Sequence, residues 1–152
     1  MADLHSDNFV VSDEGGVAVC RVFKNPAQSS AEFAVGLEKL VPTSKGLALD
    51  DKTVGFVLDL RRTPGAQSPQ VEKVMCVVAG IWEATAQRMS FLVLDDPIQK
   101  LQVTRIAAQA APQFGAVFVS RTDARAFAGA SSQSDPATVS RILERPSRIK
   151  GL

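Results

Sequence analysis

Residues 54–60 read Val-Gly-Phe-Val-Leu-Asp-Leu, an apolar run of strand length that carries a single charge. A nearly continuous run of this kind is typical of a strand that is buried on both faces of a parallel sheet. Two similar runs follow at residues 89–94 and 115–119. Segments with helical periodicity separate the three runs, which therefore predict parallel strands joined by right-handed helical crossovers.

The segments around these strands predict the other elements. The β-rich runs 9–11 and 17–23 flank Gly15-Gly16 and indicate a hairpin. A first helix is expected over residues 30–40, closed by Pro42 and followed by a polar loop. The fold class expected is α/β, with a mixed sheet of about five strands (an N-terminal hairpin, then parallel β-α units) packed with about four helices.

The clearest predicted helix spans residues 69–87, because Ser68 suits the N-cap and Pro69 the first helical position. Two further helices are expected at 98–111 and 121–128. Their periodicity predicts these residues for burial: Val71, Val74, Met75, Val78, Ile81, Trp82 and Thr85; Leu101, Val103, Ile106, Ala107 and Ala110; and Phe127.

Composition narrows the classes of function. The chain has 152 residues, which is the size of one domain, and 17 basic against 16 acidic residues, so it lacks the basic excess of a nucleic-acid binder. Its two cysteines are expected to be free thiols in a reducing cytoplasm, and its single histidine, His5, argues against a zinc site or a histidine-based triad. We expect a cytoplasmic protein with no cofactor, no metal and no membrane span.

The chain divides into three parts. Residues 1–7 are expected to be a flexible N-terminus, and residues 8–129 a single domain. Residues 130–152 form a basic tail that contains Ser and Pro. That tail is either a solvated end or a short docking helix, for which the candidate residues are Val139, Ile142 and Leu143.

Catalytic motifs are missing from the sequence. It contains no P-loop, no Gly-x-Gly-x-x-Gly, no Cys-x-x-Cys and no Gly-x-Ser-x-Gly, so we do not expect an enzyme. Asp95-Asp96 follows a predicted strand, where carboxylates hold metals in some α/β proteins, but Asp-Asp-Pro is also an ordinary strand-to-helix turn.

One alternative function uses Asp59. With Asp13 and Glu14 upstream, Asp59 ends its strand as the phosphoacceptor of a response-regulator receiver does. The Gly15-Gly16 hairpin and the Ser120-Arg121 pair after the last strand, where a receiver has Lys-Pro, count against this interpretation.

Residues 8–129 resemble the STAS domain family of bacterial anti-sigma factor antagonists and stressosome proteins. The hairpin followed by β-α units, the strand ending at Asp59-Leu60 and the loop that leads to Ser68 carry the resemblance. The family phosphorylates a Ser or Thr at the start of the next helix, and Ser68 occupies that place. The motif is degenerate, because Gln67 stands where the family has Asp and Pro69-Gln70 where it has small residues and Gly.

The resemblance implies a non-catalytic bacterial signalling module that binds a regulatory protein through loop 61–70 and the helix after it. Its expected partners are an anti-sigma factor or serine-kinase-like protein, or a sibling STAS protein, and homo-oligomers are possible. Ser68 is the candidate phosphoacceptor, since a helix N-terminus suits a phosphate and neighbouring arginines can approach it. Candidate partner-binding residues are Arg61, Arg62, Gln67 and Gln70.

Two alternatives remain open. In one, the chain is a constitutive STAS-type scaffold and Ser68 is only a helix cap. In the other, it is a receiver-like phosphoacceptor that uses Asp59, with Asp13, Asp95 and Asp96 as further candidates.

Overall fold

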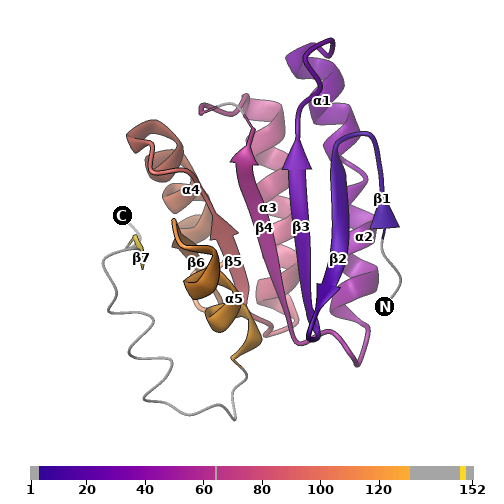
Figure 1. Cartoon of the computed structure of the whole chain (residues 1–152), viewed down its shortest axis with the longest axis vertical. Coiled ribbons are helices and arrows are strands. Elements are labelled where there is room, and N and C mark those ends of the chain that lie inside the picture. The colour runs from indigo at the N-terminus through magenta and orange to yellow at the C-terminus, as the bar shows by residue number, and fades with distance from the viewer. Residues whose placement is uncertain (1–3, 64, 131–147, 150–152) are drawn as a thin grey trace.

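The computed structural model describes residues 4–63, 65–130 and 148–149, and its strands form one mixed sheet in sequence order (Figure 1). Strands β3 to β6 are parallel, and β1, β2 and β7 pair antiparallel with their neighbours. The strands are β1 Leu4–His5, β2 Phe9–Glu14, β3 Val17–Phe23, β4 Gly55–Arg62, β5 Met89–Leu92, β6 Gly115–Phe118 and β7 Arg148–Ile149. The predicted α/β fold with a mixed sheet is confirmed.

The helices divide unequally between the two faces of the sheet. They are α1 Ser30–Leu37, α2 Leu40–Ala48, α3 Pro69–Ala84, α4 Pro97–Ala110 and α5 Arg121–Gly129. Because the parallel strands follow one another in sequence order, right-handed crossovers place α1 to α4 on the same face. Helix α5 follows the last parallel strand and packs on the opposite face, in front of the sheet in Figure 1.

Strand β4 is the centre of both cores. Phe56, Leu58 and Leu60 are buried in the core shared with α1 to α4. Val57 points to the other face and is buried with Phe127 of α5. Residues 54–60 therefore form the doubly buried strand that their apolar run predicts, beginning at Gly55.

The hairpin is also as predicted. Gly15 and Gly16 have φ values of +70° and +91°, which glycine adopts without the strain a side chain would bring. The Asp13 carboxylate accepts a hydrogen bond of 2.8 Å from the backbone N–H of Gly16 and closes the turn.

The predicted end of the first helix at Pro42 is wrong. Helix α1 stops at Leu37, and Pro42 lies in the first turn of α2, where the N–H that proline lacks has no intrahelical partner to lose. Helix α2 then continues to Ala48 through residues that we expected in a loop.

Ser29 and Glu32 form a capping box at the start of α1, and these hydrogen bonds lower the pKa of Glu32.

The expected burial of Leu101 is also wrong, because this residue is 49% exposed. At about 100° per residue, Leu101 lies roughly 160° around the helix from Val103, which faces the core. The buried position on the first turn of α4 belongs to Gln99, which is fully buried.

The edges of the sheet hold two short strands that we did not predict. Leu4–His5, expected in a flexible N-terminus, pair with β2 as β1. Arg148–Ile149 pair with β6 as β7. The candidate docking residues Val139, Ile142 and Leu143 lie outside the described residues.

Among the helices that are described, none combines the length and apolar character needed to cross a membrane.

Gly55 provides the first prediction. A Cβ there would lie 1.8 Å from the Ala128 carbonyl oxygen, whereas one at Gly80, inside α3, would meet nothing within 4 Å. We expect Gly55→Ala to lower the free energy of unfolding by at least about 2 kcal/mol, since backbone must shift. Gly80→Ala should raise it by about 0.5–1 kcal/mol. Urea denaturation of both variants checks this, and equal effects would contradict the close approach.

Candidate functional site

Ser68 lies at the carboxyl edge of the parallel strands, the edge where α/β proteins commonly place their binding sites. It is the N-cap of α3, and its Oγ accepts a hydrogen bond of 3.3 Å from the Val71 N–H. Pro69 occupies the first turn, as predicted. Ser68 is half-buried, and its side chain lies at the positive end of a 16-residue helix.

Side chains of the loop before Ser68 fix it by hydrogen bonds to one another and to the end of β4. Thr63 is buried and donates its hydroxyl to the Leu60 carbonyl at 2.7 Å. Gln67, only 8% exposed, donates from Nε2 to the Thr63 hydroxyl at 2.8 Å. Gln67, which we predicted as a partner contact, thus lies in the packing beneath the loop.

Two glutamines of α4 complete this network. Gln102 accepts from the Gln67 N–H at 2.8 Å and donates to the Gln67 carbonyl at 3.0 Å. Gln99 accepts from the Leu94 N–H at 2.8 Å and donates to the Leu60 carbonyl at 3.3 Å. These amides join the ends of β4 and β5 to α4, so loop 63–68 rests on a fixed polar support.

Arg61 and Arg62 close β4 rather than belonging to the loop. The Arg61 guanidinium forms two hydrogen bonds to the Asp59 carboxylate, at 3.0 and 2.9 Å, and this interaction raises the pKa of Arg61. Arg61 is therefore engaged on the α5 face of the sheet, since strand alternation puts Asp59 and Arg61 on the same side as Val57. The structure does not bring it to Ser68.

A hollow of about 330 Å³ lies next to the Asp59–Arg61 pair. Arg21, Arg62 and Leu94 complete its lining. Both predicted arginines therefore border a basic hollow on the α5 face, and the exposed Gln70 lies on α3 beside Ser68. The carboxyl edge thus offers two adjoining surfaces, one around the start of α3 and one around the arginines.

A second arginine cluster was missed from the sequence. Glu14, at the end of β2, pairs with Arg21 at 3.1 Å, with Arg121 at 2.8 Å and with Arg125 at 3.3 Å. Arg121 and Arg125 are four residues apart on α5, which was a detectable spacing, but their acidic partner is more than 100 positions away in the chain. The cluster adds positive charge to the same face of the sheet.

The residues of a receiver are not brought together. Asp13 is paired with Ala18 of β3, and Ala18 is paired with Phe56 of β4. Asp59 is three residues further along β4 than Phe56, so Asp13 and Asp59 are separated by about 10 Å along the strand direction. Asp96 caps α4 by accepting from the Ile98 N–H at 2.9 Å, and Asp95 pairs with Lys100. Over the described ranges 4–63, 65–130 and 148–149, no group of three or more His, Cys, Asp or Glu residues is placed to hold a metal ion.

The thiols are poorly suited to nucleophilic chemistry. Cys20 is buried between the sheet and the helices, and Cys76 is half-buried on α3. Burial raises the pKa of both thiols, and the nearby carboxylates of Asp59 and Glu72 raise them further, so both are protonated at neutral pH.

Comparisons of the chain with protein-family models, curated proteins and solved structures give no match. The resemblance to STAS domains therefore rests on the residues quoted for it from the sequence.

Gln99 tests the support beneath the loop. We expect Gln99→Met to lower the free energy of unfolding by about 1–3 kcal/mol, because it removes the amide acceptor of the Leu94 N–H, whereas the Leu60 carbonyl keeps its bonds from Thr63. The control is Gln109→Met on the exposed side of α4, for which a change within about 0.5 kcal/mol is expected. Hydrogen exchange at the Leu94 amide should quicken only in Gln99→Met, and unchanged exchange there would contradict the network.

Proposed function

We propose that this chain is a non-catalytic bacterial signalling module that binds a regulatory protein through the carboxyl edge of its sheet. The binding surface consists of loop 61–70 and the start of α3, and phosphorylation of Ser68 controls it. The partner is an anti-sigma factor, a serine-kinase-like protein or a sibling STAS-type protein. The observation that carries the proposal is the half-buried hydroxyl of Ser68 at the N-terminus of α3.

A phosphate on Ser68 has suitable donors beside it. The N–H of Val71 already points to Ser68 Oγ, and the N–H of Gln70 belongs to the same first turn. Such N–H groups, with the positive end of the helix dipole, stabilise a phosphate without any arginine. The modification is therefore expected to change the charge of the surface while the domain stays folded.

The phosphate also has a repulsive neighbour. Glu72 lies one helical turn after Ser68, and its carboxylate is 3.5 Å from the Gln102 amide. A charge of about −1.5 to −2 on Ser68 adds to that of Glu72 and makes the start of α3 strongly acidic. A partner that approaches the neutral serine with an apolar or acidic group is then repelled, which is the direction expected of a release switch.

The switch is tested by capture of partners from a lysate of the native host, with Ser68→Asp beside wild type. The matched control is Ser120→Asp, because Ser120 caps α5 with the same 3.3 Å hydrogen bond to its first turn. Aspartate is a good N-cap at both positions, so both variants should keep the melting temperature of wild type. We expect Ser68→Asp alone to reduce the amount of captured partner about tenfold, which corresponds to about 1.4 kcal/mol.

Mass spectrometry of wild-type protein after incubation with the lysate and ATP should find a phosphate on Ser68. Equal capture by wild type and Ser68→Asp, with no phosphate found, would discard the switch. In that case an unchanged set of partners supports the constitutive scaffold.

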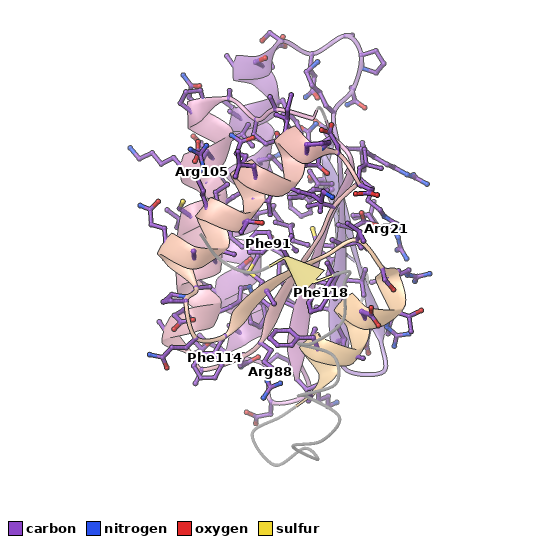
Figure 2. The ribbon with its side chains drawn as sticks, turned by 90° about the vertical axis from the view of Figure 1, so that its left-hand side faces the viewer. Arg21, Arg88, Phe91, Arg105, Phe114 and Phe118 are labelled. Atoms are coloured by element: carbon purple, nitrogen blue, oxygen red, sulfur yellow. The ribbon has the colours of Figure 1, made fainter. Side chains whose placement is uncertain are left out.

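The arginine edge gives a separate prediction. Arg62 is exposed and borders the basic hollow. Arg105 is also exposed and lies on α4, far from Arg21 of that hollow (Figure 2). We expect Arg62→Glu to slow association with the captured partner severalfold at low salt, and less at high salt, because it reverses a charge at the rim of the interface. Arg105→Glu should leave the rate unchanged. Surface plasmon resonance at two salt concentrations measures this, and equal rates for both variants place the interface elsewhere.

A further inference from the structure

Two cavities lie at opposite ends of the parallel strands. One of about 270 Å³ opens at the amino edge, at the lower end of the molecule in Figure 2, beside Arg88 and Phe114. Buried polar atoms of its wall residues, such as Oγ1 of Thr53, do not open into it. The other is the basic hollow of about 330 Å³ at the carboxyl edge, where the side chains of Arg21 and Arg61 are 35% and 39% exposed. A ligand can therefore reach the charged groups of the basic hollow.

The register of the strands brings two consecutive arginines to this hollow. Arg21 of β3 is paired with Asp59 of β4, whereas Phe23 is paired with Arg62, so β4 holds one residue more than β3 over this stretch. Consecutive residues of a regular strand point to opposite faces, and an extra residue of this kind re-aims a side chain. The irregular register thus explains how Arg61 and Arg62 line the same hollow.

The hollow has an excess of positive charge. Its charged lining consists of three arginines, Arg21, Arg61 and Arg62, and one carboxylate, that of Asp59. Both carboxylate oxygens of Asp59 accept hydrogen bonds from Arg61, and Arg62 forms no ion pair with another described residue. Three cations against one anion leave two positive charges without a counterion in the lining.

The carboxylate that pairs with Arg21 does not remove this excess. Glu14 accepts from Arg21 at 3.1 Å, but Arg121 and Arg125 share the same carboxylate at 2.8 and 3.3 Å. One negative charge therefore serves three guanidinium groups, and the charge of Arg21 is only partly compensated. An anion in the hollow would relieve the repulsion among these cations.

The guanidinium groups also keep N–H donors for a ligand. Of the five N–H groups on a guanidinium, Arg21 uses two, on Ser12 at 3.3 Å and on Glu14 at 3.1 Å. The Arg61 guanidinium likewise uses two, both on Asp59. The remaining N–H groups, with those of the third arginine, suit phosphate oxygens, which arginine binds through paired, charge-assisted hydrogen bonds.

We infer that the basic hollow binds a phosphate monoester whose carbon body rests on Leu94. The monoester dianion matches the excess of two positive charges, and its oxygens accept from Arg62 and from the free N–H groups of Arg21 and Arg61. Leu94 lines the hollow and is 42% exposed, so it offers an apolar contact beside the cations. The monoester belongs either to a small metabolite or to a phosphorylated side chain. The site needs neither the proposed partner nor a modified Ser68, and its test uses neither.

Binding is measured on the full chain by NMR, from backbone amide shifts at residues 21, 59–62 and 94 at low ionic strength. Phenyl phosphate and phenyl sulfate have the same shape, but near neutral pH the phosphate carries about −1.5 to −2 charges and the sulfate a single one. We expect phenyl phosphate to bind with a Kd of about 1 mM and phenyl sulfate at least about fivefold more weakly. Added sodium chloride should weaken both.

Arg62→Met keeps an apolar stem and removes a charge that has no partner, so the variant should fold as wild type does. We expect it to bind phenyl phosphate about tenfold more weakly. Arg105→Met, at an exposed position of α4 on the other side of the molecule from Arg21, is the matched control and should bind as wild type does (Figure 2). Leu94→Ala should weaken phenyl phosphate severalfold and leave the binding of inorganic phosphate unchanged.

A blocked pentapeptide with a central phosphoserine between alanines distinguishes the two sources of the monoester. Tighter binding of this peptide than of phenyl phosphate would identify a phosphorylated protein as the ligand, and weaker binding a small phosphate ester.

Three results would overturn the inference. The first is the absence of saturable shifts at these residues with phenyl phosphate up to about 10 mM. The second is equal binding of phenyl phosphate and phenyl sulfate. The third is phenyl phosphate binding that Arg62→Met leaves unchanged.

Discussion

Strand β4 must be buried on both faces, and the rest of the architecture depends on how this is achieved. Among the described residues, four helices cover one face, and the other is covered by the nine residues of α5. Side chains complete the cover: Arg21 bonds to Ser12 and Glu14, which are opposite Val19 and Val17 in the ladder. Its aliphatic stem therefore passes over Val19, which is 2% exposed. The arginines of this face that pair with Glu14 and Asp59 thus have a structural role, whereas Arg62 at its rim is exposed and forms no ion pair with the other described residues.

The close contact between Gly55 and α5 connects the fold to the cavity at the lower end of the sheet. Because Gly55 has no side chain, the Ala128 carbonyl can approach the start of β4. Helix α5 then ends against this edge, and Ala130 becomes part of the cavity wall. The same helix carries Phe127, whose ring lies beneath the Arg88 guanidinium. A single glycine at the start of β4 therefore positions part of the cavity wall and the ring beneath the Arg88 guanidinium.

The sequence predicted those elements whose pattern lies within a few neighbouring residues. The apolar run at 54–60, the Gly15-Gly16 turn and the Ser68-Pro69 cap depend on neighbouring residues, and all three are found. Pro42 misled the prediction because proline ends a helix only beyond its first turn. The polar support of the loop was not predictable, because Thr63, Gln67, Gln99 and Gln102 meet only once α4 lies beside the loop. The same is true of Thr53, which lines one cavity with the neighbours Gln87 and Arg88 although it precedes them by more than 30 positions.

The two edges of the sheet differ in how their polar side chains are engaged. At the carboxyl edge the amides of Gln67, Gln99 and Gln102 are engaged with one another and with backbone, which gives a fixed surface that a protein can recognise by shape and charge. At the amino edge a cavity of about 270 Å³ lies where the parallel strands begin, and buried polar atoms of its wall residues, such as Oγ1 of Thr53, do not open into it. Helix α3 runs from one edge to the other, but coupling between sites requires an element with two arrangements. Trp82 stacks on Phe56 at 4.8 Å and is fully buried, so the end of α3 is fixed to the start of β4. This packing argues against a second arrangement of α3, and therefore against coupling between the two edges through this helix.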